Sequence, residues 1–348
     1  MNLQRLRPRS VAVLRALQLG DLLCAVPALR ALRAALPRAR VTLIGLPWAA
    51  EFARRLPAYI DDFVEFPGWP GLPEREVDSA AVPRFLHEMK ARRFDLALQL
   101  HGSGAHVNSL TCLLGAARTA GFFVPGAFCP DPDSYLPYPD GGPEPRRLLA
   151  LLEFLGAPPA GAALEFPVSE EDERRWAELA RRFELRPRAF ACVHAGARWP
   201  SRRWPVERFA GVADALAADG LAVVLTGSAA EGALASELGR RMRAPAVNLA
   251  GRTDLGTLAA LLRDARLVVC NDTGVSHLAA AVGTRSVVVA SGSDVRRWAP
   301  EDAARHRVLS VDVDCRPCDF PICPIGHPCA LELGEDAVAR QAVEAASL

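Results

Sequence analysis

The stretch 267–281 holds the residues best suited to bind a charged ligand. Its apolar start, 267–270, predicts a buried strand, and the run 275–282, rich in Ala and Leu, predicts a helix. The Asp-Thr-Gly turn between them, 272–274, lets a ligand approach backbone N–H groups at the positive end of the helix dipole. Such a place suits a phosphate or a diphosphate. The alternative is that the acid or the threonine of this turn only caps the helix.

Gly20 and Asp21 form a second candidate group, because they follow the predicted strand 11–16 and precede the predicted helix 22–36. Asp21 is suited to act as a general base that takes the proton from an attacking hydroxyl. The helix dipole favours the charged carboxylate, so we expect it to take the proton as the new bond forms. The alternative role is a helix cap. With a single glycine, this loop lacks the G-x-G-x-x-G pattern of nicotinamide-binding domains, which argues against a dehydrogenase.

Two further strand ends carry polar groups beside small residues. The predicted strand 190–194 is followed by Gly196 and Ala197 and then by Arg202, whose guanidinium group can pair with phosphate oxygens. The next predicted strand ends in a Gly-Ser turn before Glu231, whose carboxylate can hold ribose hydroxyls. Solvated surface positions are the alternative for the arginines of this region and for Glu231.

Strands and helices alternate in two series along the chain. A small-residue, Pro-rich stretch, 157–167, and a charged helix, 170–183, separate them, so we place the domains at 1–168 and 169–334. The alternation predicts an α/β fold with two Rossmann-like parallel sheets, whose ligands lie at the carboxyl ends of the strands, in the cleft between the domains. A long loop is expected at 125–145. The other predicted elements are strands at 41–46, 94–100, 221–226 and 247–249 and helices at 206–218, 230–242, 255–262 and 335–346.

Composition narrows the classes of protein that fit. A chain of 348 residues, half of them hydrophobic, can form two domains. The formal net charge of +1 gives no reason to expect nucleic acid as a partner. Arg15 and Asp21 interrupt the N-terminal apolar stretch, which argues against a secretion signal, and we see no apolar run long enough to span a bilayer. We therefore expect a cytoplasmic protein whose nine cysteines are thiols or metal ligands.

Four of those cysteines lie close together near the C-terminal end: Cys315, Cys318, Cys323 and Cys329. In a reducing compartment this clustering favours a structural Zn²⁺ site over disulfides, although the spacing contains one close pair where zinc sites usually have two. Reduced thiols that pack the loop without a metal are one alternative. An iron–sulfur cluster is another.

Six short motifs, spread in order over most of the chain, give it a specific resemblance to glycosyltransferase family 9, the ADP-heptose:lipopolysaccharide heptosyltransferases. The motifs are Leu19-Gly20-Asp21-Leu22-Leu23 with Pro27, Arg93-Phe94-Asp95-Leu96, His194-Ala195-Gly196, Arg202-Arg203-Trp204-Pro205, Asn248-Leu249-Ala250-Gly251-Arg252-Thr253, and Asn271-Asp272-Thr273-Gly274 with His277. The resemblance implies a GT-B fold and an inverting, metal-independent sugar transfer from a nucleotide diphosphate sugar.

The resemblance also implies roles for single residues. Asp21 matches the family's proposed base, and Arg202 stands where a lysine usually meets the donor phosphates. Asp272 matches a residue near the donor sugar, Glu231 matches the acid that holds the ribose, and the turn after Asp272 matches the diphosphate-binding backbone. The implied donor-side residues are Gly196, Ala197, Arg202, Glu231, Asp272, Thr273, Gly274 and Val275, and those expected on the acceptor side are Gly20, His101 and Ser103.

The resemblance therefore implies a GT-B glycosyltransferase that moves a heptose-like sugar from an ADP-sugar to a glycan or lipopolysaccharide-core hydroxyl. No cofactor is expected for catalysis. A lipid-linked acceptor would bring the protein into peripheral contact with the inner face of the cytoplasmic membrane. The C-terminal helix 335–346 is expected to pack back on the first domain, as in other proteins of this architecture. The alternatives are a GT-B transferase or an epimerase that uses another nucleotide sugar, and a non-catalytic relative that binds one.

Overall fold

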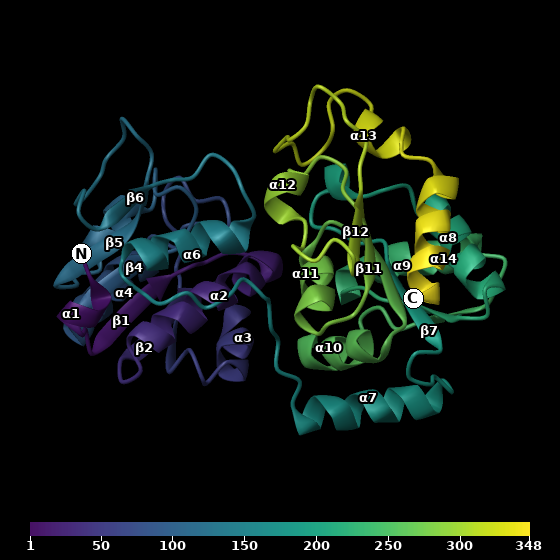
Figure 1. Cartoon of the computed structure of the whole chain (residues 1–348), viewed down its shortest axis with the longest axis horizontal. Coiled ribbons are helices and arrows are strands. Elements are labelled where there is room, and N and C mark those ends of the chain that lie inside the picture. The colour runs from purple at the N-terminus through teal and green to yellow at the C-terminus, as the bar shows by residue number, and fades with distance from the viewer. The chain divides into compact units, whose positions relative to one another are not determined.

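The computed structural model describes all residues, 1–348, and the chain divides into two compact units, Met1–Leu164 and Glu165–Leu348 (Figure 1). The boundary expected from the sequence, after residue 168, lies four residues beyond the observed one. Each unit is an α/β structure built on one six-stranded parallel sheet.

The first unit has the strand order β3-β2-β1-β4-β5-β6. Its central strand β1 is buried along its whole apolar part because helices cover both faces of a parallel sheet. The strands are β1 (Ser10–Leu14), β2 (Arg40–Gly45), β3 (Asp62–Glu65), β4 (Leu96–Gln99), β5 (Arg118–Phe123) and β6 (Tyr135–Pro137). The helices are α1 (Leu3–Leu6), α2 (Leu19–Ala35), α3 (Ala49–Arg55), α4 (Ala81–Arg92), α5 (Asn108–Leu113) and α6 (Glu144–Phe154).

Two expectations for this unit need correction. The stretch 125–145, expected to be a loop, contains the edge strand β6, which has three residues and is too short to show an alternating pattern. Helix α2 begins at Leu19 and not near residue 22, so Gly20 and Asp21 lie in its first turn. A reciprocal pair of hydrogen bonds between Gln18 and Asp21 starts the helix there, and a glutamine is not the residue type that predicts such a cap.

The second unit has the strand order β12-β11-β10-β7-β8-β9. Counted from its own first strand, this is the order of the first unit and of Rossmann-type nucleotide-binding sheets. The strands are β7 (Phe190–His194), β8 (Ala222–Leu225), β9 (Ala246–Asn248), β10 (Leu267–Asn271), β11 (Ser286–Val289) and β12 (His306–Leu309). The α-helices are α7 (Glu170–Arg182), α8 (Val206–Ala218), α9 (Gly232–Arg241), α10 (Leu255–Asp264), α11 (Gly274–Ala281), α12 (Val295–Trp298), α13 (Pro328–Leu331) and α14 (Glu335–Ser347), and single 3₁₀ turns cover Pro200–Arg202 and Ala229–Glu231.

The C-terminal helix α14 belongs to the second unit, which corrects the expectation that it returns to the first. It packs against α8 and against β10 and β11, on one face of the sheet, while α10 and α11 lie on the other face (Figure 1). Val338 and Ala342 are fully buried in the core that these elements share. The apolar face of a helix predicts that the helix packs on a core. The sequence period does not tell which of the two sheets forms that core.

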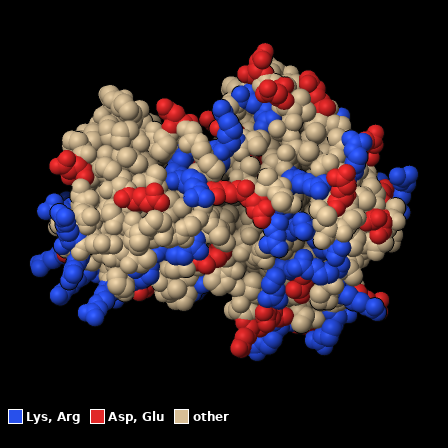
Figure 2. Space-filling model, viewed as in Figure 1, with Lys and Arg blue, Asp and Glu red and all other residues tan.

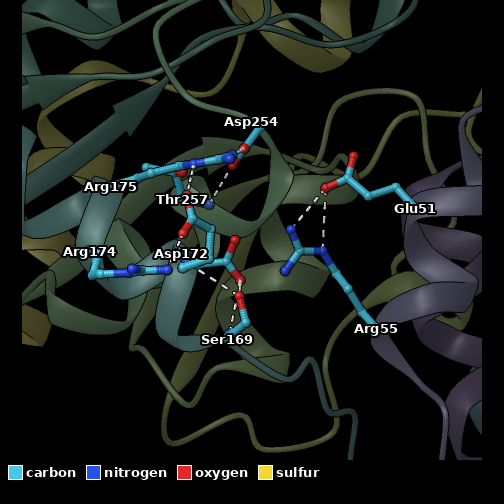
Figure 3. A network of polar contacts seen from close by, with 9 residues as sticks. Glu51, Arg55, Ser169, Asp172, Arg174, Arg175, Asp254 and Thr257 are labelled. Atoms are coloured by element: carbon cyan, nitrogen blue, oxygen red, sulfur yellow. Dashed lines mark hydrogen bonds and ion pairs between the residues drawn. The ribbon is translucent and has the colours of Figure 1, made fainter.

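Helix α7 shows how local polar contacts fix the ends of these elements (Figure 3). Ser169 and Asp172 form a capping box at its N-terminus, with the Asp172 carboxylate accepting hydrogen bonds from the backbone and the hydroxyl of Ser169. Arg175, one turn further along, pairs with Asp254, the residue that caps α10. A partly exposed ion pair therefore links α7 to the start of α10.

The face shown in Figure 2 mixes basic and acidic side chains, which agrees with the net charge of +1. Many of the arginines have acidic neighbours one helical turn away, such as Glu51 and Arg55 on α3, which pair at 2.9 Å (Figure 3). None of the helices combines the length and the apolar character needed to cross a membrane.

Candidate functional site

Asn271, the last residue of β10, organises the carboxyl edge of the second sheet. Its side chain is fully buried, and its Oδ1 accepts a hydrogen bond from the backbone N–H of Trp204 at 2.9 Å. Its Nδ2 donates to the carbonyl oxygens of Ala195 and Gly196, at 2.8 and 3.3 Å. One amide therefore fixes both the turn that leaves β7 and the segment that leads into α8.

Gly196 lies directly against the carboxylate of Glu231. A Cβ atom at position 196 would stand 2.0 Å from Glu231 Oε1, so any other residue would displace the carboxylate from this position. Burial alone would raise the pKa of the Glu231 carboxyl. Hydrogen bonds from the backbone N–H and hydroxyl of Ser228 and the charge of the neighbouring His194 outweigh it, and the pKa is lowered.

His194, at the end of β7, is buried and its Nδ1 lies 3.2 Å from the hydroxyl of Thr226. Burial lowers the pKa of its imidazole, because a charged ring loses its hydration there. The carboxyl ends of β7 and β8 thus carry a buried imidazole and a partly buried carboxylate, which lies directly against the Gly196 backbone.

The start of α11 has the form expected of an anion-binding turn. Thr273 occupies the N-cap position in an extended conformation, but its side chain makes no capping hydrogen bond. Its carbonyl oxygen accepts bonds from the backbone N–H and the hydroxyl of Ser276, at 2.9 and 2.7 Å. The backbone N–H of Asp272 donates to the carbonyl oxygen of Val289 in β11, which extends the hydrogen-bond ladder between β10 and β11 by one residue. Gly274 and Val275 form the first helical turn, where backbone N–H groups suit an anion.

Arg202 points toward the segment 315–329 of its own unit, which holds the four clustered cysteines and is called the cysteine-rich loop. Its Nη2 donates to the carbonyl oxygen of Cys318, and the guanidinium group lies over the ring of Trp199, 5.7 Å from the centroid. Asp319, which is fully exposed, lies 3.8 Å away. The neighbouring Arg203 is not simply solvated, because its Nε donates to the carbonyl oxygen of Ala197 at 2.9 Å.

The four clustered cysteines are free thiols, and no three His, Cys, Asp or Glu side chains of the structure are arranged to hold a metal ion. Cys329 is buried, and its burial and the nearby thiols of the other three raise its pKa. His327 donates its backbone N–H to the Cys323 sulfur and contacts the carbonyl oxygen of Ser201 through its ring. The donor atoms are of the type that zinc prefers, but in this structure they do not converge on one point.

In the first unit, Asp21 lies beside a fully buried arginine that follows β1. Arg15 donates from Nε to the carbonyl oxygen of Asp21 at 2.8 Å, and its Nη2 lies 4.0 Å from Asp21 Oδ1. The same nitrogen binds Glu144 Oε1 at 3.1 Å, so Arg15 is held between the starts of α2 and α6. Asp21 also accepts a bond from the N–H of Gln18 at 3.2 Å. It is therefore both a helix cap and a partly exposed carboxylate next to a buried cation.

The residues expected on the acceptor side share one edge of the first sheet. His101 is buried after β4, and its Nδ1 accepts a bond from the N–H of Ala16 at 3.1 Å. Its Nε2 lies 3.7 Å from Glu74 Oε2. Gln99, the last residue of β4, holds this loop by donating a hydrogen bond from its Nε2 to the carbonyl oxygen of His101. Ser103 is half-buried in the same loop, and Gly20 is buried in α2.

Sequence reasoning missed the supporting residues of both edges. Arg15 and Gln99 are polar residues in or directly after apolar strands. This pattern predicts a buried side chain that needs a hydrogen-bond partner. Glu144 carried no such signal, because its partner Arg15 lies 129 residues away in the chain. Asn271 stood in a recognised motif, but its contacts to Trp204 and Ala195 are set only by the packing of the sheet.

Two Rossmann-like sheets in one chain, with polar groups gathered at the carboxyl ends of their strands, are the architecture of the GT-B class of protein. A model of "Glycosyltransferase family 9 (heptosyltransferase)" matches residues 82–327, which is more than half of the sequence. The chain belongs to glycosyltransferase family 9.

Curated relatives match over shorter stretches. Lipooligosaccharide heptosyltransferase 2 of Haemophilus ducreyi is 36% identical over 95 residues, which are 26% of this chain and 27% of the relative. Lipopolysaccharide heptosyltransferase 2 of Escherichia coli is 33% identical over 114 residues, 32% of each chain. The aligned segments thus span about a third or less of the length of these relatives.

Solved structures match over most of the chain and confirm the GT-B fold. A glycosyl transferase family 9 protein from Veillonella parvula superposes with a TM-score of 0.72 at 23% identity, over 86% of this chain and 85% of the other. The E. coli ADP-heptose lps heptosyltransferase II superposes with a TM-score of 0.70 at 20% identity, over 97% and 98%.

The contacts of Asn271 predict that Asn271→Ala destabilises the protein by about 3 kcal/mol, since it leaves one N–H and two carbonyl oxygens without their partner. Urea unfolding of the full chain measures this difference. Asn248→Ala, at a partly exposed amide, is the control and should cost about 1 kcal/mol or less. Equal losses in the two variants would contradict the organising role of Asn271.

Proposed function

We propose that this protein is an inverting, metal-independent glycosyltransferase that transfers a heptose-like sugar from an ADP-sugar to a glycan or lipopolysaccharide-core hydroxyl. The observation that carries the proposal is the family 9 match over residues 82–327. The relatives named heptosyltransferases support the choice of sugar, and the E. coli structure named for ADP-heptose supports the choice of nucleotide.

The second unit would bind the donor. In the proposed arrangement the diphosphate lies against the backbone N–H groups that start α11, at Thr273, Gly274 and Val275, with Arg202 as the cation. Glu231 would accept hydrogen bonds from the ribose hydroxyls, close to Gly196 and Ala197. Asp272, the residue before the turn, would lie near the donor sugar.

The chemical step then needs no metal. The acceptor oxygen attacks the anomeric carbon from the face opposite the diphosphate, and the bond from that carbon to the phosphate oxygen breaks with its electron pair going to ADP. Arg202 and the helix N-terminus stabilise the charge that develops on the leaving group. Asp21 takes the proton of the attacking hydroxyl as the new C–O bond forms.

The first unit would bind the acceptor. We propose that Gly20, His101 and Ser103, which share the carboxyl edge of its sheet, contact the acceptor sugar near Asp21. If the acceptor is lipid-linked, the protein acts in the cytoplasm as a peripheral protein at the inner face of the membrane. Catalysis requires no cofactor, and the cysteine-rich loop would hold a structural Zn²⁺ only after its thiols move closer together.

A nucleotide panel tests the donor. ADP is expected to raise the melting temperature of the purified protein more than UDP, GDP or NAD⁺ at equal concentration, because a ligand that binds only the folded state stabilises it. A larger shift with UDP or GDP would point to another nucleotide sugar. No shift with any nucleotide would contradict a nucleotide-sugar enzyme.

Asp21→Asn is expected to lower kcat by roughly a hundredfold or more, with the affinity for ADP nearly unchanged, because asparagine can cap the helix but cannot take the proton. Asp172→Asn is a matched control, since Asp172 occupies the same capping-box position in α7. It should lose some stability and keep its kcat. Full turnover in Asp21→Asn, measured with the donor and acceptor, would leave Asp21 as a helix cap alone.

Removing metal ions tests whether a metal stabilises the fold and whether one is needed for sugar transfer. After treatment with a chelator, we expect the melting temperature to fall if about one zinc per chain is present by elemental analysis, since metal binding supplies folding free energy to this loop. Turnover should fall less than in Asp21→Asn. Loss of activity that only Mg²⁺ or Mn²⁺ restores would contradict metal-independent transfer, and protein free of zinc would contradict the structural metal.

A further inference from the structure

A group of buried polar atoms without partners surrounds the loop that follows β11. Four such atoms occur there: Arg202 Nη1, Ser291 Oγ, Ser293 Oγ and Arg316 Nε. Ser291 is 1% exposed and Ser293 is 8% exposed, so these hydroxyls have little contact with bulk solvent. Each unpaired buried donor costs about 1–3 kcal/mol, so four together call for a ligand that accepts hydrogen bonds.

Hydrogen bonds and close contacts join Arg202 and Arg316 to one short loop, which contains both serines. Gly292 lies between the two serines, and a Cβ atom on it would stand 2.5 Å from Arg202 Nη1. Arg316 Nη2 donates to the carbonyl oxygen of Ser293 at 3.0 Å. The N–H of Cys318 donates to the carbonyl oxygen of Gly292 at 3.0 Å, and the carbonyl oxygen of Cys318 accepts from Arg202. Glycine at 292 is what lets the guanidinium group come this close to the backbone.

The charges in this group are not balanced by the protein. Arg316 donates its two Nη groups to the carbonyl oxygens of Val311 and Ser293, and no carboxylate pairs with it. The carboxylate near Arg202 is that of Asp319, which lies 3.8 Å away and is fully exposed, where solvent screens it. Two guanidinium groups that contact the loop and two buried hydroxyls within it are donors of the kind that bind a phosphate group.

We propose that Ser291, Ser293 and Arg316 form, with Arg202, a subsite for a phosphate group at the carboxyl end of β11. Arg316 belongs to the cysteine-rich loop, so this loop supplies a binding residue as well as structure. The proposal deepens the proposed function and rests on it for the origin of the phosphate, which is either the donor diphosphate or a phosphate carried by the acceptor. The hydrogen-bonding chemistry is the same for both.

The test titrates inorganic phosphate into the full-length protein at fixed ionic strength and measures the heat of binding. Wild-type protein should bind phosphate, and Arg316→Gln should bind it at least about tenfold more weakly, because a charge-assisted hydrogen bond is lost. Arg316→Lys keeps the charge and should recover most of the affinity. Ser291→Ala combined with Ser293→Ala should weaken binding with both arginines in place.

Arg296→Gln is the control, because Arg296 follows the same loop but its side chain is 84% exposed and pairs with Asp294. It should bind phosphate like the wild type. Melting temperatures of all variants show whether each is folded. The proposal is overturned if the wild type binds no phosphate, if Arg316→Gln binds it as well as the wild type does, or if Arg296→Gln loses as much affinity as Arg316→Gln.

A second titration, in the presence of saturating ADP, identifies the origin of the phosphate. If ADP excludes inorganic phosphate, the subsite holds a phosphate of the donor. If phosphate binds equally well beside ADP, the subsite serves a phosphate of another substrate. Wild-type protein that binds phosphate but not ADP would contradict the proposed donor and still support the subsite, so the two proposals fail separately.

Discussion

The candidate donor site of the second unit depends on one buried side-chain amide. Asn271 stands where β10 ends, and it satisfies one N–H and two carbonyl oxygens of segments that have left the sheet. These segments have no ladder to pair with, so their backbone groups need a side chain or water. The Asn271 amide makes all three bonds because its oxygen accepts while its NH2 group donates twice; a carboxylate has no hydrogen to donate, and a hydroxyl has only one.

The same constraint explains why small residues gather at this edge. Gly196 leaves room for the Glu231 carboxylate, and Gly292 leaves room for the Arg202 guanidinium group. Charged groups thereby come close to backbone that is already fixed by Asn271 and by the parallel ladder. The result is a rigid edge that presents both an acidic and a basic group without bringing them into a salt bridge with each other.

In the first unit a buried arginine holds together segments that have left the sheet. Arg15 ties the start of α2 to the start of α6 through Asp21 and Glu144. A buried arginine is costly unless several acceptors surround it, and here a carboxylate and two carbonyl oxygens do so, those of Asp21 and Leu100. The backbone at Asp21 is thus held by an arginine that also pairs with Glu144, 129 residues along the chain from Arg15, in addition to the helix cap.

The sequence by itself determined the alternation of strands and helices, the two parallel-sheet α/β domains and the strand end that carries Asp272. These follow from local patterns, since an apolar run predicts a strand and small or polar residues mark where it ends. Helix starts such as that of α2 were less predictable, because Gln18 is an unusual cap.

Only the tertiary structure decided which residues hold those turns in place. Arg15 meets Glu144 across 129 residues, Arg202 meets the cysteine-rich loop across 116, and α14 joins the second unit. Hydrogen bonds between distant segments leave no period or spacing in the sequence, because they form only when the sheets bring the ends of their strands to one edge.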